Sequence, residues 1–147
     1  MELTLKYDCL IDKEIKDYLL KINGIEDIKI NLDTGEIYIK YNNISIKLIL
    51  MEVELFLDVV KFPSLIGFDK HSKNKLLDYE MIINDLCCEC CLKINIDKLF
   101  ETEGIESVGT DFDYEYINKK DVKIFIKYDN NKINIESIKK LENEFNK

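Results

Sequence analysis

Hydrophobic residues along this chain follow two spacings, and these spacings predict its first elements. Leu3, Leu5 and Tyr7 alternate with polar residues, which is the period of a half-buried strand. Apolar residues then recur at the spacing that gives a helix one apolar face, at Ile11, Ile15, Tyr18, Leu19 and Ile22. Asn23-Gly24 predicts the end of this helix, because glycine tolerates the left-handed conformation that is common just past a helix end.

The rest of the first half predicts a hairpin, a helix and a closing strand. These elements are strands at Ile25–Leu32 and Glu36–Tyr41, a helix at Ile44–Val59 and a strand at Lys61–Phe68. Asp33-Thr34-Gly35 supplies the turn of the hairpin. Pro63 restricts the closing strand to a sheet edge or a strand start, because proline has no N–H to donate.

The second half repeats this order after a polar linker at residues 69–76, which carries the only histidine, His71. The expected elements are a strand at Tyr79–Leu86, a helix ending at Glu103-Gly104, strands at Ile105–Val108 and Asp121–Tyr128, and a helix at Ile135–Phe145. Asn134 is the expected N-cap of the last helix, since asparagine accepts hydrogen bonds from free backbone N–H groups there.

Two pairs of matching segments indicate that the halves are copies of one unit. Asn23–Ile28 resembles Glu103–Val108, 80 residues later, and Ile39–Asn43 resembles Ile126–Asn130, 87 residues later. The offset changes between the second and third strands of the unit, where a longer connection costs little free energy.

The repeated order is that of the split β-α-β, or ferredoxin-like, pattern. We therefore predict an α+β protein of two fused ferredoxin-like units, residues 1–68 and 77–147, of which the second lacks its last strand. The strand Tyr79–Leu86 would then have a bare edge, which proteins usually avoid. We expect Lys61–Phe68 or a second chain to cover that edge.

Four of the five cysteines gather in Cys87-Cys88-Glu89-Cys90-Cys91, between a predicted strand and a predicted helix. The N-terminal segment Met1–Lys6 is charged and lacks the apolar core of a signal peptide, so we expect a cytoplasmic protein with reduced thiols. In a reducing compartment, we expect clustered thiols to be metal ligands or redox groups rather than structural disulfides. Thiolates favour copper(I) and zinc, and a helix start lowers thiol pKa values.

A Cys-x-x-Cys before a helix and Gly104-Ile105-Glu106-x-Val108 after it resemble the heavy-metal-associated domain family. That family has a split β-α-β fold and binds copper(I) or other soft ions between two cysteines at the start of its first helix. The resemblance implies that Cys88 and Cys91 are the ligands, with Cys87 and Cys90 as an overlapping pair of extra thiols. Asp8 and Ile11 occupy the equivalent positions of residues 1–68, so the resemblance implies a degenerate first unit without a metal site.

The leading hypothesis is therefore a copper(I)- or zinc-binding protein of chaperone or buffer type. Its partners would be the metal ion and either another metal-binding protein or a second copy of the chain. The alternative is a non-enzymatic protein-interaction module of the same fold with buried structural cysteines and no metal. In that alternative Asn95 caps a short helix from Ile96, and the cysteines lie in an extended strand. Thiol–disulfide exchange by the Cys-x-x-Cys is a third, weaker hypothesis.

Other classes of function have little support in the sequence. The net charge of −8 disfavours nucleic acid as a partner. Charged residues interrupt the longest apolar stretch, near Ile44–Val60, so no membrane span is expected. No phosphate-binding glycine loop or Ser/His/Asp set is present, so we expect no enzyme activity. We expect His71 and the acidic tract Asp111–Glu115 to be solvated.

Overall fold

The computed structural model describes residues 1–7, 14–58, 65–84, 89–111 and 121–146. It divides into two compact units, Met1–Leu65 and Ile66–Lys147, which we describe separately. The described residues contain seven strands and four helices, and the strands pair antiparallel within each unit. The prediction of an α+β protein is confirmed at this level.

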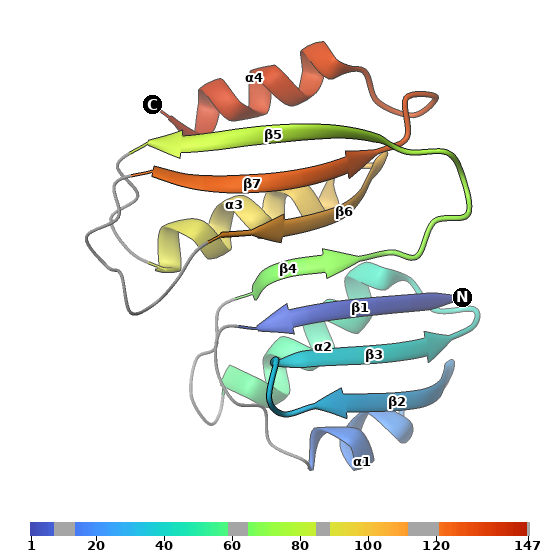
Figure 1. Cartoon of the computed structure of the whole chain (residues 1–147). Helices are drawn as coiled ribbons and strands as arrows, with labels where there is room; N and C mark the ends of the chain where they lie inside the picture. Colours follow the sequence, from blue (N-terminus) through green and yellow to red (C-terminus); the bar gives the residue numbers. More distant parts are fainter. Residues whose placement is uncertain (8–13, 59–64, 85–88, 112–120, 147) are drawn as a thin grey trace. The chain divides into compact units, whose positions relative to one another are not determined.

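The first unit is a three-stranded sheet with two helices (Figure 1). Its elements are β1 (Glu2–Tyr7), α1 (Ile15–Leu20), β2 (Ile25–Asn31), β3 (Glu36–Tyr41) and α2 (Ile46–Asp58), and its strand order is β2-β3-β1. The alternation in β1 buries Leu3, Leu5 and Tyr7, as predicted. The helices contact each other through the rings of Tyr18 and Phe56, whose centroids lie 5.1 Å apart.

The second unit has the strand order β4-β6-β7-β5. Its elements are β4 (Leu65–Asp69, which crosses the unit boundary), β5 (Leu77–Asn84), α3 (Glu89–Glu101), β6 (Ile105–Thr110), β7 (Asp121–Tyr128) and α4 (Ile135–Phe145). In β7 every second residue is buried, at Val122, Ile124, Ile126 and Tyr128. Helix α3 contacts β6, and α4 runs along β5 at the edge of the sheet (Figure 1).

The matched sequence segments have the same backbone geometry in the two units. The pairing register shifts between Ile25 and Asp27 in β2 and between Ile105 and Ser107 in β6. Gly24 has a φ of 102° and its carbonyl accepts from Asn42 N–H at 2.8 Å. Gly104 has a φ of 96° and its carbonyl accepts from Asp129 N–H at 2.7 Å.

Both glycines are required by their surroundings as well as by their backbone conformation. A Cβ at Gly24 would lie 2.8 Å from the Asn42 carbonyl oxygen, and one at Gly104 would lie 2.7 Å from Ile133 Cγ2. Since an L side chain at such a φ is also strained, any other residue would be costly at either position. The repeated Gly-Ile-Glu segment therefore marks one tight turn that is used twice.

Of the two alternatives expected to cover the edge of the first strand of the second unit, the segment Lys61–Phe68 is wrong for its described residues, and a second chain stays a prediction. In β4, Phe68 pairs with Val108 of β6, on the other side of the sheet. On the outer edge of β5, backbone groups of Ile82 and Asn84 are instead bonded by side chains of Glu142 in α4 and of Asn146, the C-cap of that helix. Helix α4 thus lies along that edge, and β4 pairs with the edge of β6 that faces away from β7.

The segment expected to be a linker has hydrogen bonds within the second unit. Lys70 N–H donates to the Glu106 carbonyl at 2.8 Å, and Asn74 Nδ2 donates to the Asp129 carboxylate at 3.0 Å. The division between the units falls within β4, before this segment.

Candidate functional site

The cysteine cluster lies where β5 leads into α3. The strand ends at Asn84 and the helix begins at Glu89, so Cys87 and Cys88 fall outside the described residues. Cys90 and Cys91 are the second and third residues of α3, and the structure describes their backbone only. The equivalent stretch of the first unit, with Asp8, Cys9 and Ile11, also lies outside the described residues.

The bounds of helix α3 exclude the arrangement in which the cysteines lie in an extended strand. An extended strand through Cys90, Leu92 and Ile94, followed by a helix from Ile96, is wrong because the helix already begins at Glu89. Leu92 is fully buried whereas Ile94 is 68% exposed, as expected for residues two positions apart on a helix. The buried face of α3 consists of Leu92, Ile96, Leu99 and Phe100.

This helix start has chemistry that suits thiolates. The first N–H groups of a helix have no partner within the helix, and the helix dipole places partial positive charge there. Both effects stabilise a thiolate over a thiol and lower the pKa of a cysteine in the first turn. Cys90 and Cys91 have backbone positions in this turn.

Other candidate ligands are engaged elsewhere or lie outside the described residues. His71 is half-buried, with Nδ1 3.9 Å from an Asp69 carboxylate oxygen. The Asp111 carboxylate accepts from Lys123 N–H at 2.8 Å, and residues 112–115 of the acidic tract are not described. Within the described ranges, no three His, Cys, Asp or Glu residues are grouped so that they could hold a metal ion.

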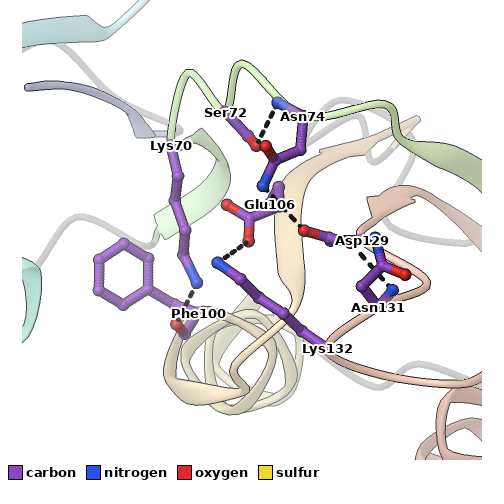
Figure 2. Close-up of polar contacts among 8 residues, drawn as sticks. All are labelled: Lys70, Ser72, Asn74, Phe100, Glu106, Asp129, Asn131 and Lys132. Carbon is purple, nitrogen blue, oxygen red and sulfur yellow. Dashed lines mark hydrogen bonds and ion pairs between the residues drawn. The ribbon is translucent and has the colours of Figure 1, made fainter.

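A polar cluster lies at the other end of α3 (Figure 2). Lys70 Nζ donates to the Phe100 carbonyl oxygen at 2.9 Å, in the last turn of the helix, where carbonyls lack helical partners. The ammonium also lies 5.4 Å from the centre of the Phe68 ring and 5.3 Å from that of Phe100. Burial lowers the pKa of Lys70, and the nearby Glu106 carboxylate opposes this shift.

Two acidic groups complete this cluster. Glu106 is 8% exposed and lies 3.8 Å from Lys132 Nζ. Asp129 is 2% exposed and accepts from Asn74 Nδ2 and from Asn131 N–H, at 3.0 and 2.9 Å. These contacts join the β4–β5 connection to α3 and to the turn before α4 (Figure 2).

The polar cluster is a structural feature rather than an extension of the cysteine site. Its buried acidic groups bond to neighbouring residues of the same unit. Helix α3 has 13 residues, so its two ends lie about 20 Å apart. A metal at the cysteines would therefore not contact Lys70 or Glu106.

Sequence reasoning missed the polar contacts between α4 and β5. The Glu142 carboxylate accepts from the Tyr79 hydroxyl and, at 2.7 Å, from Ile82 N–H. The Asn146 side chain accepts from Asn84 N–H at 2.7 Å and donates to the Ile82 carbonyl at 3.0 Å. The available signal was the helical spacing of the apolar residues Ile135, Ile138, Leu141 and Phe145, which predicts a helix but not its partner.

An apolar stripe on α2 is also exposed. Leu48, Met51 and Leu55 are 43%, 51% and 59% exposed, and their spacing places them on one side of the helix. The opposite side is buried, at Ile49, Leu50, Val53 and Leu57. Exposed apolar residues gathered on one face often mark a protein-interaction surface.

No helix in the described parts of the chain is long and apolar enough to cross a membrane. Comparisons of the sequence with models of known protein families and with curated proteins find no match.

Proposed function

We propose that this protein binds a soft metal ion, copper(I) or zinc, as a chaperone or buffer. The observation that carries the proposal is the start of α3 at Glu89, directly after Cys87 and Cys88 and including Cys90 and Cys91. The strand orders β2-β3-β1 and β6-β7-β5, with their shared bulge and glycine turn, support two ferredoxin-like copies. A cysteine pair at the first helix of such a unit is the arrangement of the heavy-metal-associated family.

In this proposal Cys88 and Cys91 supply the primary thiolates. Two thiolates suit two-coordinate copper(I), or half of a tetrahedral zinc site that another molecule completes. Cys87 and Cys90 have the same spacing and add thiols for a higher coordination number. Glu89 lies between the pairs, where its charge raises thiol pKa values but attracts a cation.

The dipole of α3 favours the deprotonated ligands, and metal binding would release protons from the remaining thiols. In a chaperone, thiolates of a partner domain would replace those of this chain one at a time. The proposed partner is therefore another thiol-bearing metal-binding protein or a second copy of the chain. No residue in this proposal has a catalytic role.

Competitive titration tests the proposal. The reduced protein would be titrated with copper(I) against a chelator of known affinity, beside a Cys88→Ser/Cys91→Ser variant. We expect about one tightly bound ion per chain, and its loss in the variant. A Cys9→Ser variant is the control, because Cys9 lies outside the cluster and should leave affinity unchanged. Equal affinity of the wild type and the double variant would contradict the proposal.

The exposed stripe of α2 favours a second candidate function, a protein-interaction module without metal. Leu48, Met51 and Leu55 would form its contact surface. The two candidates differ in thiol reactivity, because a metal-transfer site must be accessible whereas structural cysteines are buried. Fast alkylation of Cys88 and Cys91 in the native protein supports the metal site, and alkylation only after unfolding supports the interaction module.

A further inference from the structure

The outer edge of β5 is bonded by side chains, where a neighbouring strand would use its backbone. Ile82 N–H donates to Glu142 and Ile82 C=O accepts from Asn146, so both groups point away from β7. Asn84 N–H donates to Asn146 as well. The Asn146 side-chain amide thus gives the edge a donor and an acceptor, which is the chemistry of a peptide group.

The helix that supplies these groups has a narrow buried face. Of the residues of α4, only Ile138 is fully buried in the structure. Leu141 and Phe145 are half-buried, and Glu142, Asn146 and Tyr79 make polar contacts between this end of α4 and β5. Polar contacts at a half-exposed surface contribute little net free energy each, since water replaces them when they break. Release of α4 would therefore expose a strand edge mainly at the cost of exposing Ile138 and the half-buried Leu141 and Phe145.

The edge of β5 is self-complementary in an antiparallel register centred on Ile82. The N–H and C=O of Ile82 both point outward, so two copies would exchange both hydrogen bonds in this register. Met81 would then face the partner's Ile83 on the buried side of the sheet, and both side chains are apolar. On the exposed side Glu80 would face the partner's Asn84, which avoids opposed like charges.

We propose that the outer edge of β5 is a strand-pairing surface for β5 of a second copy of this chain, and that α4 closes it in the monomer. Pairing replaces side-chain bonds by backbone bonds and continues the sheet across the two-fold axis. The inference is independent of the proposed metal site, because β5 pairing involves none of the cysteines.

A Glu142→Ala/Asn146→Ala variant tests the proposal by light scattering after size-exclusion chromatography. We expect dimers at concentrations where the wild type is monomeric. The matched control is Asn143→Ala/Glu144→Ala, which removes the same two residue types from exposed positions of the same helix and should stay monomeric. A double variant that stays monomeric at all accessible concentrations overturns the proposal.

A further substitution tests the surface itself. Ile82→Pro in the Glu142→Ala/Asn146→Ala background removes an N–H that points away from β7, so the pairing with β7 is kept. We expect this triple variant to be monomeric. A dimer that persists would use another surface, and β5 would be excluded.

Amide hydrogen exchange tests the opening of α4 in the unmodified chain, whether or not the variants fold. We expect the Ile82 and Asn84 amides to exchange at least tenfold faster than that of Ile83, which faces β7. Equal rates would mean that α4 does not open separately from the sheet, and would overturn the proposal.

Discussion

The Lys70 ammonium is bonded to the Phe100 carbonyl oxygen, 2.9 Å away, and so caps the C-terminal end of α3. A cation at a helix C-terminus interacts favourably with the helix dipole. The rings of Phe68 and Phe100 add contacts with the same ammonium, 5.4 and 5.3 Å from their centres. One lysine therefore ties the end of β4 to the helix that begins with the cysteines.

Lys70→Met should destabilise the second unit. The substitution keeps an apolar stem but loses the charged hydrogen bond and the ring contacts, so the free energy of unfolding should fall by about 1–2 kcal/mol. Urea denaturation followed by circular dichroism measures this change. Lys75→Met is the control, since Lys75 is an exposed lysine of the same connection. Equal stability of the two variants would show that the capping contact contributes nothing.

Gly24→Ala and Gly104→Ala should each destabilise the unit that contains the glycine. The positive φ alone costs about 1–2 kcal/mol for a residue with a Cβ, and the close contacts add to it. We therefore expect losses of about 2 kcal/mol or more in urea denaturation. Gly109→Ala is the control, because a Cβ there would meet nothing within 4 Å and should change stability little.

Local sequence patterns predicted the features that depend on residues close together in the sequence. The alternation of β7 gave its buried face, and Asn134 caps α4 as predicted, accepting from Ser137 N–H at 2.8 Å. The bonds from Glu142 and Asn146 to Ile82 cross 60 residues or more, and no periodicity encodes them. For the same reason the sequence did not show that Lys61–Phe68, one of the two alternatives for the edge of β5, pairs with β6 instead.

The candidate site shows the same limit. Composition and spacing identified the cysteine cluster and a helix after it, and that helix, α3, begins at Glu89 within the cluster. The role of Lys70 was not predicted, because a lysine in a polar connection has no pattern that distinguishes it from a solvated one. Metal binding by Cys88 and Cys91 stays a prediction for the titration to test.

The hydroxyl of Tyr79 should ionise at unusually high pH. Burial, the hydrogen bond to Glu142 and the charge of that carboxylate raise the pKa of Tyr79 to about 12. The folded state thus holds this proton more tightly than the unfolded state does. The corresponding stability is present below the ordinary pKa of about 10 and is lost as pH rises towards about 12.

Tyrosinate absorbance measures this ionisation. The difference between the wild type and a Tyr79→Phe variant should contain a single component with a midpoint near 12. Glu142→Gln should lower that midpoint, since it removes the negative charge beside the phenol. A difference component at the ordinary tyrosine pKa would mean that the contact with α4 is absent in solution.

Weakening the N-terminus of α4 should open the edge of β5 more often. Asn134→Ala removes the bond to Ser137 N–H, and loss of an N-cap costs about 1 kcal/mol. If α4 opens as a unit, the Ile82 and Asn84 amides should exchange about fivefold faster, the factor that about 1 kcal/mol gives.

Ser45→Ala is the control, because Ser45 Oγ accepts from Leu48 N–H at the start of α2 in the other unit. That variant should leave exchange at Ile82 unchanged. An equal response to both substitutions would mean that these amides exchange by unfolding of the whole chain rather than by release of α4.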